Sequence, residues 1–162
     1  MKKILIIGDS FAADWSVKYT DYKGWVNLLA EIHDVTNAAQ AGVSEYKIYK
    51  QLQKYQAKLS IFDYIIVHHT SPYRVPTIGH PVHDFDKLHG SADLIFSDIE
   101  YHSKQWKNIF NRSLHAAKAY YDFHYDQEFY LTTYKLYKEK IENMLKNFKT
   151  ITIDCKSTDR KS

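Results

Sequence analysis

The chain has 162 residues, which is enough for one domain with a real hydrophobic core. It is 44% hydrophobic and 25% charged, as is usual for a globular protein, and no apolar run approaches the roughly 20 residues that span a bilayer. The formal charge of +3 by itself excludes no class of partner. The lysines near the C-terminus alternate with acidic residues, however, so we expect neither a nucleic-acid nor a membrane partner. A single cysteine, Cys155, excludes an internal disulfide, and we expect a cytoplasmic protein.

The first 70 residues alternate between short apolar runs and amphipathic stretches. Apolar runs over 3–7, 34–39 and 62–69 predict three strands. Apolar residues at helical spacing predict one helix over 24–33 and another from 44 to 59. This β-α-β-α-β order is typical of a parallel sheet with helices on both faces.

The pattern changes after residue 70. Residues 71–98 contain all three prolines and no periodic pattern, and so long a loop inside a compact domain is commonly functional. Two long helices are predicted over about 99–122 and 126–147. The second carries tyrosines at steps of 3 and 4, which suits core packing and also a contact between subunits of a homo-oligomer. Residues 150–155 predict a fourth strand.

Two short motifs resemble signature blocks of the SGNH, or GDSL-like, hydrolases. "IIGDSFAADW" (6–15) is similar to their first block at the end of the first strand. "NAAQAGVS" (37–44) is similar to their second block, in which a glycine follows an asparagine by five residues and precedes a helix. The resemblance covers roughly residues 3–75. It implies a three-layer, flavodoxin-like α/β fold with strand order 2-1-3-4, as a single domain over 1–162.

The resemblance also implies ester hydrolysis by a serine nucleophile. Ser10 matches the nucleophile, and the backbone amides of Ser10 and Gly42 match donors that stabilise the oxyanion of the tetrahedral intermediate. Asp9 is better suited to shaping or capping the turn after the first strand than to chemistry. The expected substrate is a small acyl ester or a carbohydrate ester, with no cofactor.

The third family block is altered in this chain. The family usually ends its third strand with Gly-x-Asn-Asp, whereas this strand ends "HHTSPYR". The hydroxyl of Thr70 or Ser71 then takes the place of the asparagine donor. Arg74 is a candidate clamp for an anionic substrate group or, equally, one half of an ion pair at the loop edge.

The C-terminal Asp-x-x-His of the family, which supplies the general base, is absent. Truncation of the chain, a base recruited from elsewhere, and loss of activity with a retained binding pocket are three explanations. If the base is recruited from elsewhere, His68 and His69 at the end of the third strand are candidates, and only one of them can face a given side of the sheet. We select His69.

The loop segment "GHPVHDFDKLH" supports another hypothesis. His80 and His83, with Asp84 or Asp86, offer nitrogen and oxygen ligands for the metal ion of a metal-dependent hydrolase. Histidines at the surface of a loop are the simpler interpretation, so the leading prediction includes no metal.

Overall fold

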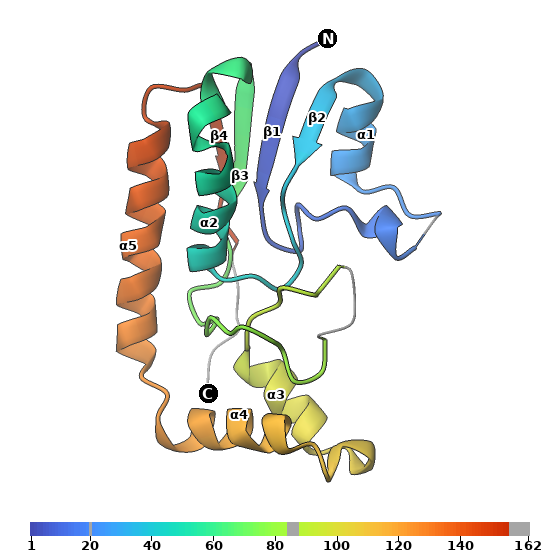
Figure 1. The fold of residues 1–162 in the computed structure, drawn as a ribbon, viewed down its shortest axis with the longest axis vertical. Coiled ribbons are helices and arrows are strands. Elements are labelled where there is room, and N and C mark those ends of the chain that lie inside the picture. The colour runs from blue at the N-terminus through green and yellow to red at the C-terminus, as the bar shows by residue number, and fades with distance from the viewer. Residues whose placement is uncertain (20, 84–87, 156–162) are drawn as a thin grey trace.

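The computed structural model describes residues 1–19, 21–83 and 88–155 (Figure 1). Within these residues the chain forms an all-parallel, four-stranded sheet in the order β2-β1-β3-β4, together with five α-helices. The predicted α/β class and the strand order 2-1-3-4 are therefore confirmed. The strands are β1 (Lys3–Gly8), β2 (Asp34–Asn37), β3 (Tyr64–His68) and β4 (Thr150–Ile153). The helices are α1 (Trp25–Ile32), α2 (Glu45–Tyr55), α3 (Phe96–Ser103), α4 (Arg112–Phe123) and α5 (Gln127–Leu145), with short 3-10 turns at η1 (Trp15–Val17), η2 (Gln56–Ile61) and η3 (Trp106–Asn108).

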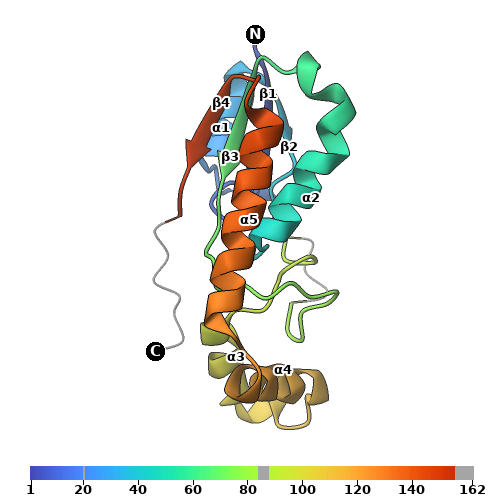
Figure 2. The same ribbon diagram turned by 90° about the vertical axis from the view of Figure 1, so that its left-hand side faces the viewer.

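Helices cover both faces of the sheet because successive side chains of a strand point to opposite sides. Leu5 and Ile7 of β1 are fully buried in a cluster that includes residues of α2 and α5. Ile4 and Ile6, which alternate with them, pack on the other face with residues of α1. Figure 2 shows α2 and α5 in front of the sheet and α1 behind it. The apolar runs of β1 and β3 are thus buried from two sides.

The single helix predicted over about 99–122 is wrong. In the structure α3 ends at Ser103, and α4 begins at Arg112 after the turn η3. The side chain of Asn111 accepts a hydrogen bond of 3.0 Å from the amide of Leu114, so it caps the start of a new helix. Trp106 and Phe110, which extended the apparent apolar stripe, lie in the connection and are 83% and 92% exposed.

The second long helix is confirmed as α5, with ends within two residues of the prediction. Its N-cap is Asp126, whose carboxylate accepts from the amide of Phe129. Tyr137 in the middle of α5 packs against Tyr46 and Tyr49 of α2, with ring centroids 5.2 and 5.5 Å apart. Part of the tyrosine stripe is thus used within the chain, and the homo-oligomer stays a prediction.

The segment after β3 crosses the carboxyl edge of the sheet, and α3 and α4 lie beyond it (Figure 1). The described residues of this segment are largely irregular, as predicted, although α3 already begins at Phe96. Val75 and Leu94 pair in an isolated antiparallel bridge and close the base of the loop between them. Buried residues of α3 and α4, including Ile99 and Leu114, form a second apolar cluster. In the described ranges, none of the helices combines the length and apolar character needed to cross a membrane.

Candidate active site at the carboxyl edge of the sheet

Gly8 ends β1 in a conformation that only glycine adopts readily. Its φ is +155°, and a Cβ there would lie 2.8 Å from both the Cβ and the carbonyl oxygen of His68. The side chain of Gln51 on α2 accepts from the Gly8 amide at 2.8 Å and donates to the Gly8 carbonyl at 3.1 Å. The chain therefore leaves the sheet at a defined point, directly before Asp9 and Ser10.

Asp9 is buried and shapes the turn, as expected from the sequence. Its Oδ1 accepts a hydrogen bond of 3.1 Å from the amide of Phe11. The same oxygen lies 3.0 Å from Nδ1 of His68, and the His68 ring stacks on Phe11 at 5.4 Å. Asp9 thus joins the end of β3 to the loop that carries Ser10.

Ser10 is half-buried and lines two neighbouring hollows. Its carbonyl accepts a hydrogen bond of 2.7 Å from the indole nitrogen of Trp15. Within the part of the chain that the structure describes, the Ser10 hydroxyl makes no hydrogen bond. A hydroxyl held at the mouth of a cleft with no internal partner is available to a substrate.

Gly42, the other predicted oxyanion donor, lines the same hollow as Ser10, a cleft of about 330 Å³. Its φ is +78°, and a Cβ there would lie 2.8 Å from the Cβ of Ala92. Asn37, the asparagine of the second motif, donates to the carbonyl of Ala12 at 2.9 Å and so ties that motif to the Ser10 loop. The structure brings the two predicted oxyanion residues to one cleft.

The three predicted residues after β3 are placed differently from one another. Thr70 and Ser71 are buried and are not among the residues that line the two Ser10 hollows. Arg74 lines the cleft, and its guanidinium donates to the Thr70 hydroxyl at 3.0 Å and to the Gly42 carbonyl at 3.2 Å. Over the described ranges Arg74 forms no ion pair, so its charge faces the cleft with neutral partners only.

His69 lies on the α5 side of the sheet. Its Nδ1 is 2.5 Å from Oε1 of Glu45, and both residues are at least 98% buried. His69 lines a separate hollow with Val67 and residues of α5, and no contact among the described residues joins it to Ser10. The sequence held no sign of this pairing with Glu45.

The loop histidines gather around an acid that the sequence reasoning missed. Nε2 of His83 lies 3.1 Å, and Nε2 of His80 3.3 Å, from Oδ2 of Asp98 on α3. Nε2 of His102, one turn further along α3, lies 3.2 Å from Oδ1 of Asp98. The acids named in the metal hypothesis, Asp84 and Asp86, lie outside the described residues. Asp98 follows His83 by 15 residues, too far for a spacing motif to reveal it.

Burial and mutual contact set the charges in this cluster. Burial, opposed by the Asp98 carboxylate, lowers the pKa of His83 below its ordinary value. Burial acts to raise the pKa of Asp98, but the hydrogen bond from His80 and the charges of the neighbouring histidines outweigh it and lower that pKa. Asp98 is therefore an anion at neutral pH.

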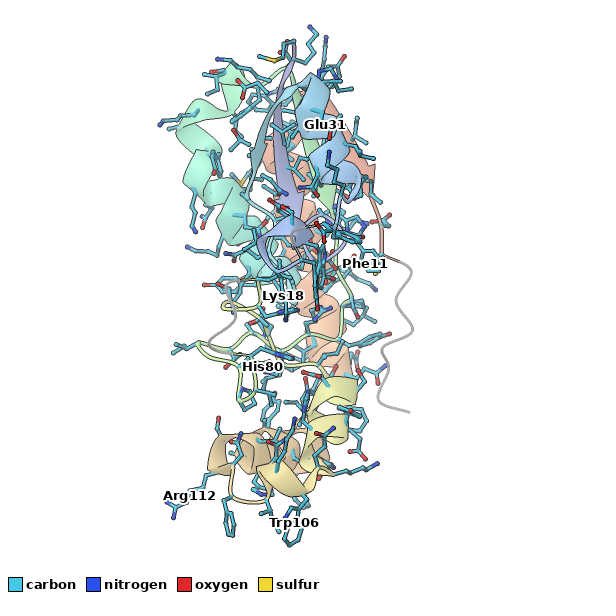
Figure 3. All side chains as sticks on the ribbon, turned by 90° about the vertical axis from the view of Figure 1, so that its right-hand side faces the viewer. Phe11, Lys18, Glu31, His80, Trp106 and Arg112 are labelled. Atoms are coloured by element: carbon cyan, nitrogen blue, oxygen red, sulfur yellow. The ribbon has the colours of Figure 1, made fainter. Side chains whose placement is uncertain are left out.

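His89 connects the cluster to the Ser10 loop. The His83 ring packs against the His80 ring at 4.6 Å in a tilted arrangement, and it stacks on the His89 ring at 5.1 Å. The His89 ring in turn makes an edge contact with the Trp15 ring at 5.7 Å. All three histidines line the cleft with Ser10. Figure 3 shows His80 at the level between the end of the sheet, marked by Phe11, and the helical end marked by Trp106.

The second hollow beside Ser10, of about 380 Å³, is lined by aromatic rings: Phe11, Trp15, Tyr22 and Trp25. Trp25 donates its indole hydrogen to the carbonyl of Phe11 at 2.7 Å, as Trp15 does to Ser10. Both indoles are thus anchored to the backbone of the Ser10 loop. Ser10 lies between a polar cleft and an aromatic one.

Comparison with known proteins found no match to a protein-family model or a curated protein, so any functional assignment depends on the geometry of the site. Membership of the SGNH hydrolases therefore stays a prediction that rests on the two motifs.

Proposed function

We propose that this protein is a serine-dependent ester hydrolase of SGNH-like type, with Ser10 as its nucleophile. The observation that carries the proposal is that Ser10, Gly42 and three histidines from a distant loop line one cleft at the carboxyl edge of a parallel sheet. Ligands bind to open α/β sheets at this edge. Ser10 and Gly42 come from different strand–helix connections, so their meeting is a property of the fold.

In the first step the Ser10 Oγ attacks the ester carbonyl carbon, and its proton passes to a histidine. The backbone amides of Ser10 and Gly42 are the proposed donors to the resulting oxyanion. When the intermediate collapses, the histidine gives this proton to the departing alcohol, and an acyl group remains on Ser10. A water molecule then adds to the acyl carbon by the same route and releases the acid and the free hydroxyl.

We propose His89 as the base. It lines the Ser10 cleft, and its ring touches Trp15, the residue that holds the Ser10 carbonyl. His69, the base predicted from the sequence, contacts Glu45 and lines a different hollow. His68 has the carboxylate of Asp9 beside it, as a catalytic histidine often has, but is not among the residues that line either Ser10 hollow.

The proposed substrate is a small acyl ester or a carbohydrate ester. The flat, anchored indoles of Trp15 and Trp25 offer a stacking surface for the apolar face of a ring or for an acyl group. On the other side of Ser10, the guanidinium of Arg74 suits an anionic group of the same substrate.

The test is hydrolysis of p-nitrophenyl acetate by the purified chain and its variants. Ser10→Ala should lower kcat by roughly a thousandfold or more, and His89→Ala by roughly a hundredfold or more. Ser60→Ala, an exposed serine on η2, and His124→Ala, an exposed histidine after α4, are the matched controls and should leave kcat unchanged.

Labelling of Ser10 by a fluorophosphonate, followed by peptide mass analysis, gives a second readout that does not depend on the choice of ester. Full activity in Ser10→Ala would refute the nucleophile. A chain that neither turns over the ester nor reacts with the phosphonate would instead be a binding protein that keeps the cleft.

A further inference from the structure

We propose that His80, His83 and Asp98 form a binding site for one divalent transition-metal ion of the Zn²⁺ class. The inference stands on the geometry of these three residues and does not depend on the proposed reaction of Ser10. One ligand atom from each lies within 4.8 Å of the others.

The distances within the cluster agree with tetrahedral coordination. Bonds of about 2.0–2.1 Å from zinc to nitrogen or oxygen place neighbouring ligand atoms roughly 3.3 Å apart in a tetrahedron. The Asp98 Oδ2 lies 3.3 Å from Nε2 of His80 and 3.1 Å from Nε2 of His83. The third distance, between the ligand atoms of the two imidazoles, is at most 4.8 Å, so an ion requires these atoms to approach by no more than about 1.5 Å.

The donor set selects among metals. Two imidazole nitrogens with one carboxylate oxygen suit Zn²⁺, Co²⁺ or Ni²⁺, whereas Mg²⁺ and Ca²⁺ prefer oxygen ligands alone.

The surroundings of Asp98 supply an outer partner. Nε2 of His102 lies 3.2 Å from Oδ1, the carboxylate oxygen that does not face His80 and His83. A ligating carboxylate is commonly held in this way by a second residue, which fixes its orientation. His102 lies on α3, one turn after Asp98, so the partner is provided by the helix itself.

The site is enclosed on one side and open on the other. The His80 side chain is 2% exposed, while those of His83 and Asp98 are 30% and 26% exposed, and all three line the cleft that holds Ser10. Three protein ligands with one open position is the arrangement of a catalytic rather than a structural zinc site. The ion would also tie the loop at 80–83 to α3.

Metal binding requires one local change. The amide of Val82 now donates to Nδ1 of His80 at 3.2 Å, which leaves the proton of a neutral ring on Nε2. Ligation through Nε2 moves that proton to Nδ1, so the bond from Val82 must open. It is at the long end of the hydrogen-bond range and is the contact we expect to yield.

Calorimetric titration of the EDTA-treated, dialysed chain with ZnCl₂ tests the inference. The wild type should bind one equivalent, confirmed by elemental analysis after gel filtration. His83→Ala and Asp98→Ala should each weaken this binding at least a hundredfold, and His102→Ala by roughly ten- to a hundredfold. His124→Ala, at an exposed histidine, is the control and should bind like the wild type. Circular dichroism of the metal-free variants checks that each is folded.

Should a variant fail to fold, titration of the wild type with Co²⁺ takes its place. Four-coordinate Co²⁺ should give intense visible absorption that excess Zn²⁺ abolishes. Wild type that binds no more Zn²⁺ than His83→Ala, or a Co²⁺ spectrum without those bands, overturns the inference.

The outcomes separate this inference from the proposed function. Phosphonate labelling of Ser10 in a chain that binds no metal refutes the metal site alone. One bound equivalent of Zn²⁺, with full esterase activity in Ser10→Ala, refutes the serine mechanism and leaves the metal site in place.

Discussion

The indole nitrogen of Trp15 donates a hydrogen bond of 2.7 Å to the carbonyl of Ser10. The same Trp15 ring touches His89, so one side chain links the proposed nucleophile to the loop histidines. Because the bond runs to the backbone, it fixes the turn after β1 and leaves the Ser10 hydroxyl unconstrained.

Replacing Trp15 by Phe should keep a ring in the cleft but remove the hydrogen bond. We expect the free energy of unfolding to fall by about 1 kcal/mol, the net contribution of one such bond. Because the Ser10 loop is then less well held, kcat for p-nitrophenyl acetate should fall by roughly tenfold. Urea denaturation and steady-state kinetics measure the two effects.

Trp106→Phe is the matched control for that variant, since Trp106 is 83% exposed and distant from the site. It should change neither quantity. Equal effects of the two substitutions would show that the bond from Trp15 has no special role.

Gly42→Ala should damage both stability and activity. A side chain at φ +78° is strained, and the new methyl would meet the Cβ of Ala92 at 2.8 Å. We expect a loss of about 1–3 kcal/mol in the free energy of unfolding. Gly79→Ala provides the comparison, because a Cβ there meets nothing within 4 Å, and it should be close to neutral. A neutral Gly42→Ala would contradict the close approach described for this loop.

His69→Ala should act on stability. It leaves the Glu45 side chain buried without its nearest hydrogen-bond partner, which typically costs about 1–3 kcal/mol. The double variant His69→Ala with Glu45→Gln should recover part of the loss, since an unpaired amide costs less to bury than an unpaired carboxylate. A double-mutant cycle by urea denaturation measures the coupling. A large fall in kcat in a fully stable His69→Ala would return the base assignment to His69.

Asp14 should make stability depend on pH in the acidic range. Its pKa is lowered, first by the hydrogen bond from the Asn27 side chain and then by that from Ser16. A lowered folded-state pKa contributes stability that is present above the ordinary pKa of 3.8 and is lost as the pH falls below it. The difference in unfolding free energy between wild type and Asp14→Asn should therefore be largest from pH 5 upward and shrink toward pH 3. Parallel pH profiles for the two proteins would rule out this role.

The sequence by itself determined the parallel sheet and the positions where its connections turn. Continuous apolar runs mark β1 and β3 because both faces of these strands are buried. Gly8 and Gly42 stand out because each has a positive φ, a local backbone conformation that favours glycine. These signals are local, since backbone geometry repeats every two to four residues.

Only the tertiary structure decided which side chains meet at the site. His80 and His83 meet Asp98 of α3 only in the folded chain, since no periodic pattern in the sequence encodes which residues an irregular segment brings together. His69 contacts Glu45 of α2. The sequence does not predict this contact, because the side of the sheet on which a residue just after a strand lies depends on the neighbouring elements that pack against it. The sequence pattern did not reveal the break before α4, because apolar residues continue at helical spacing through Trp106 and Phe110. Only the structure shows that both rings are exposed and that Asn111 caps a new helix.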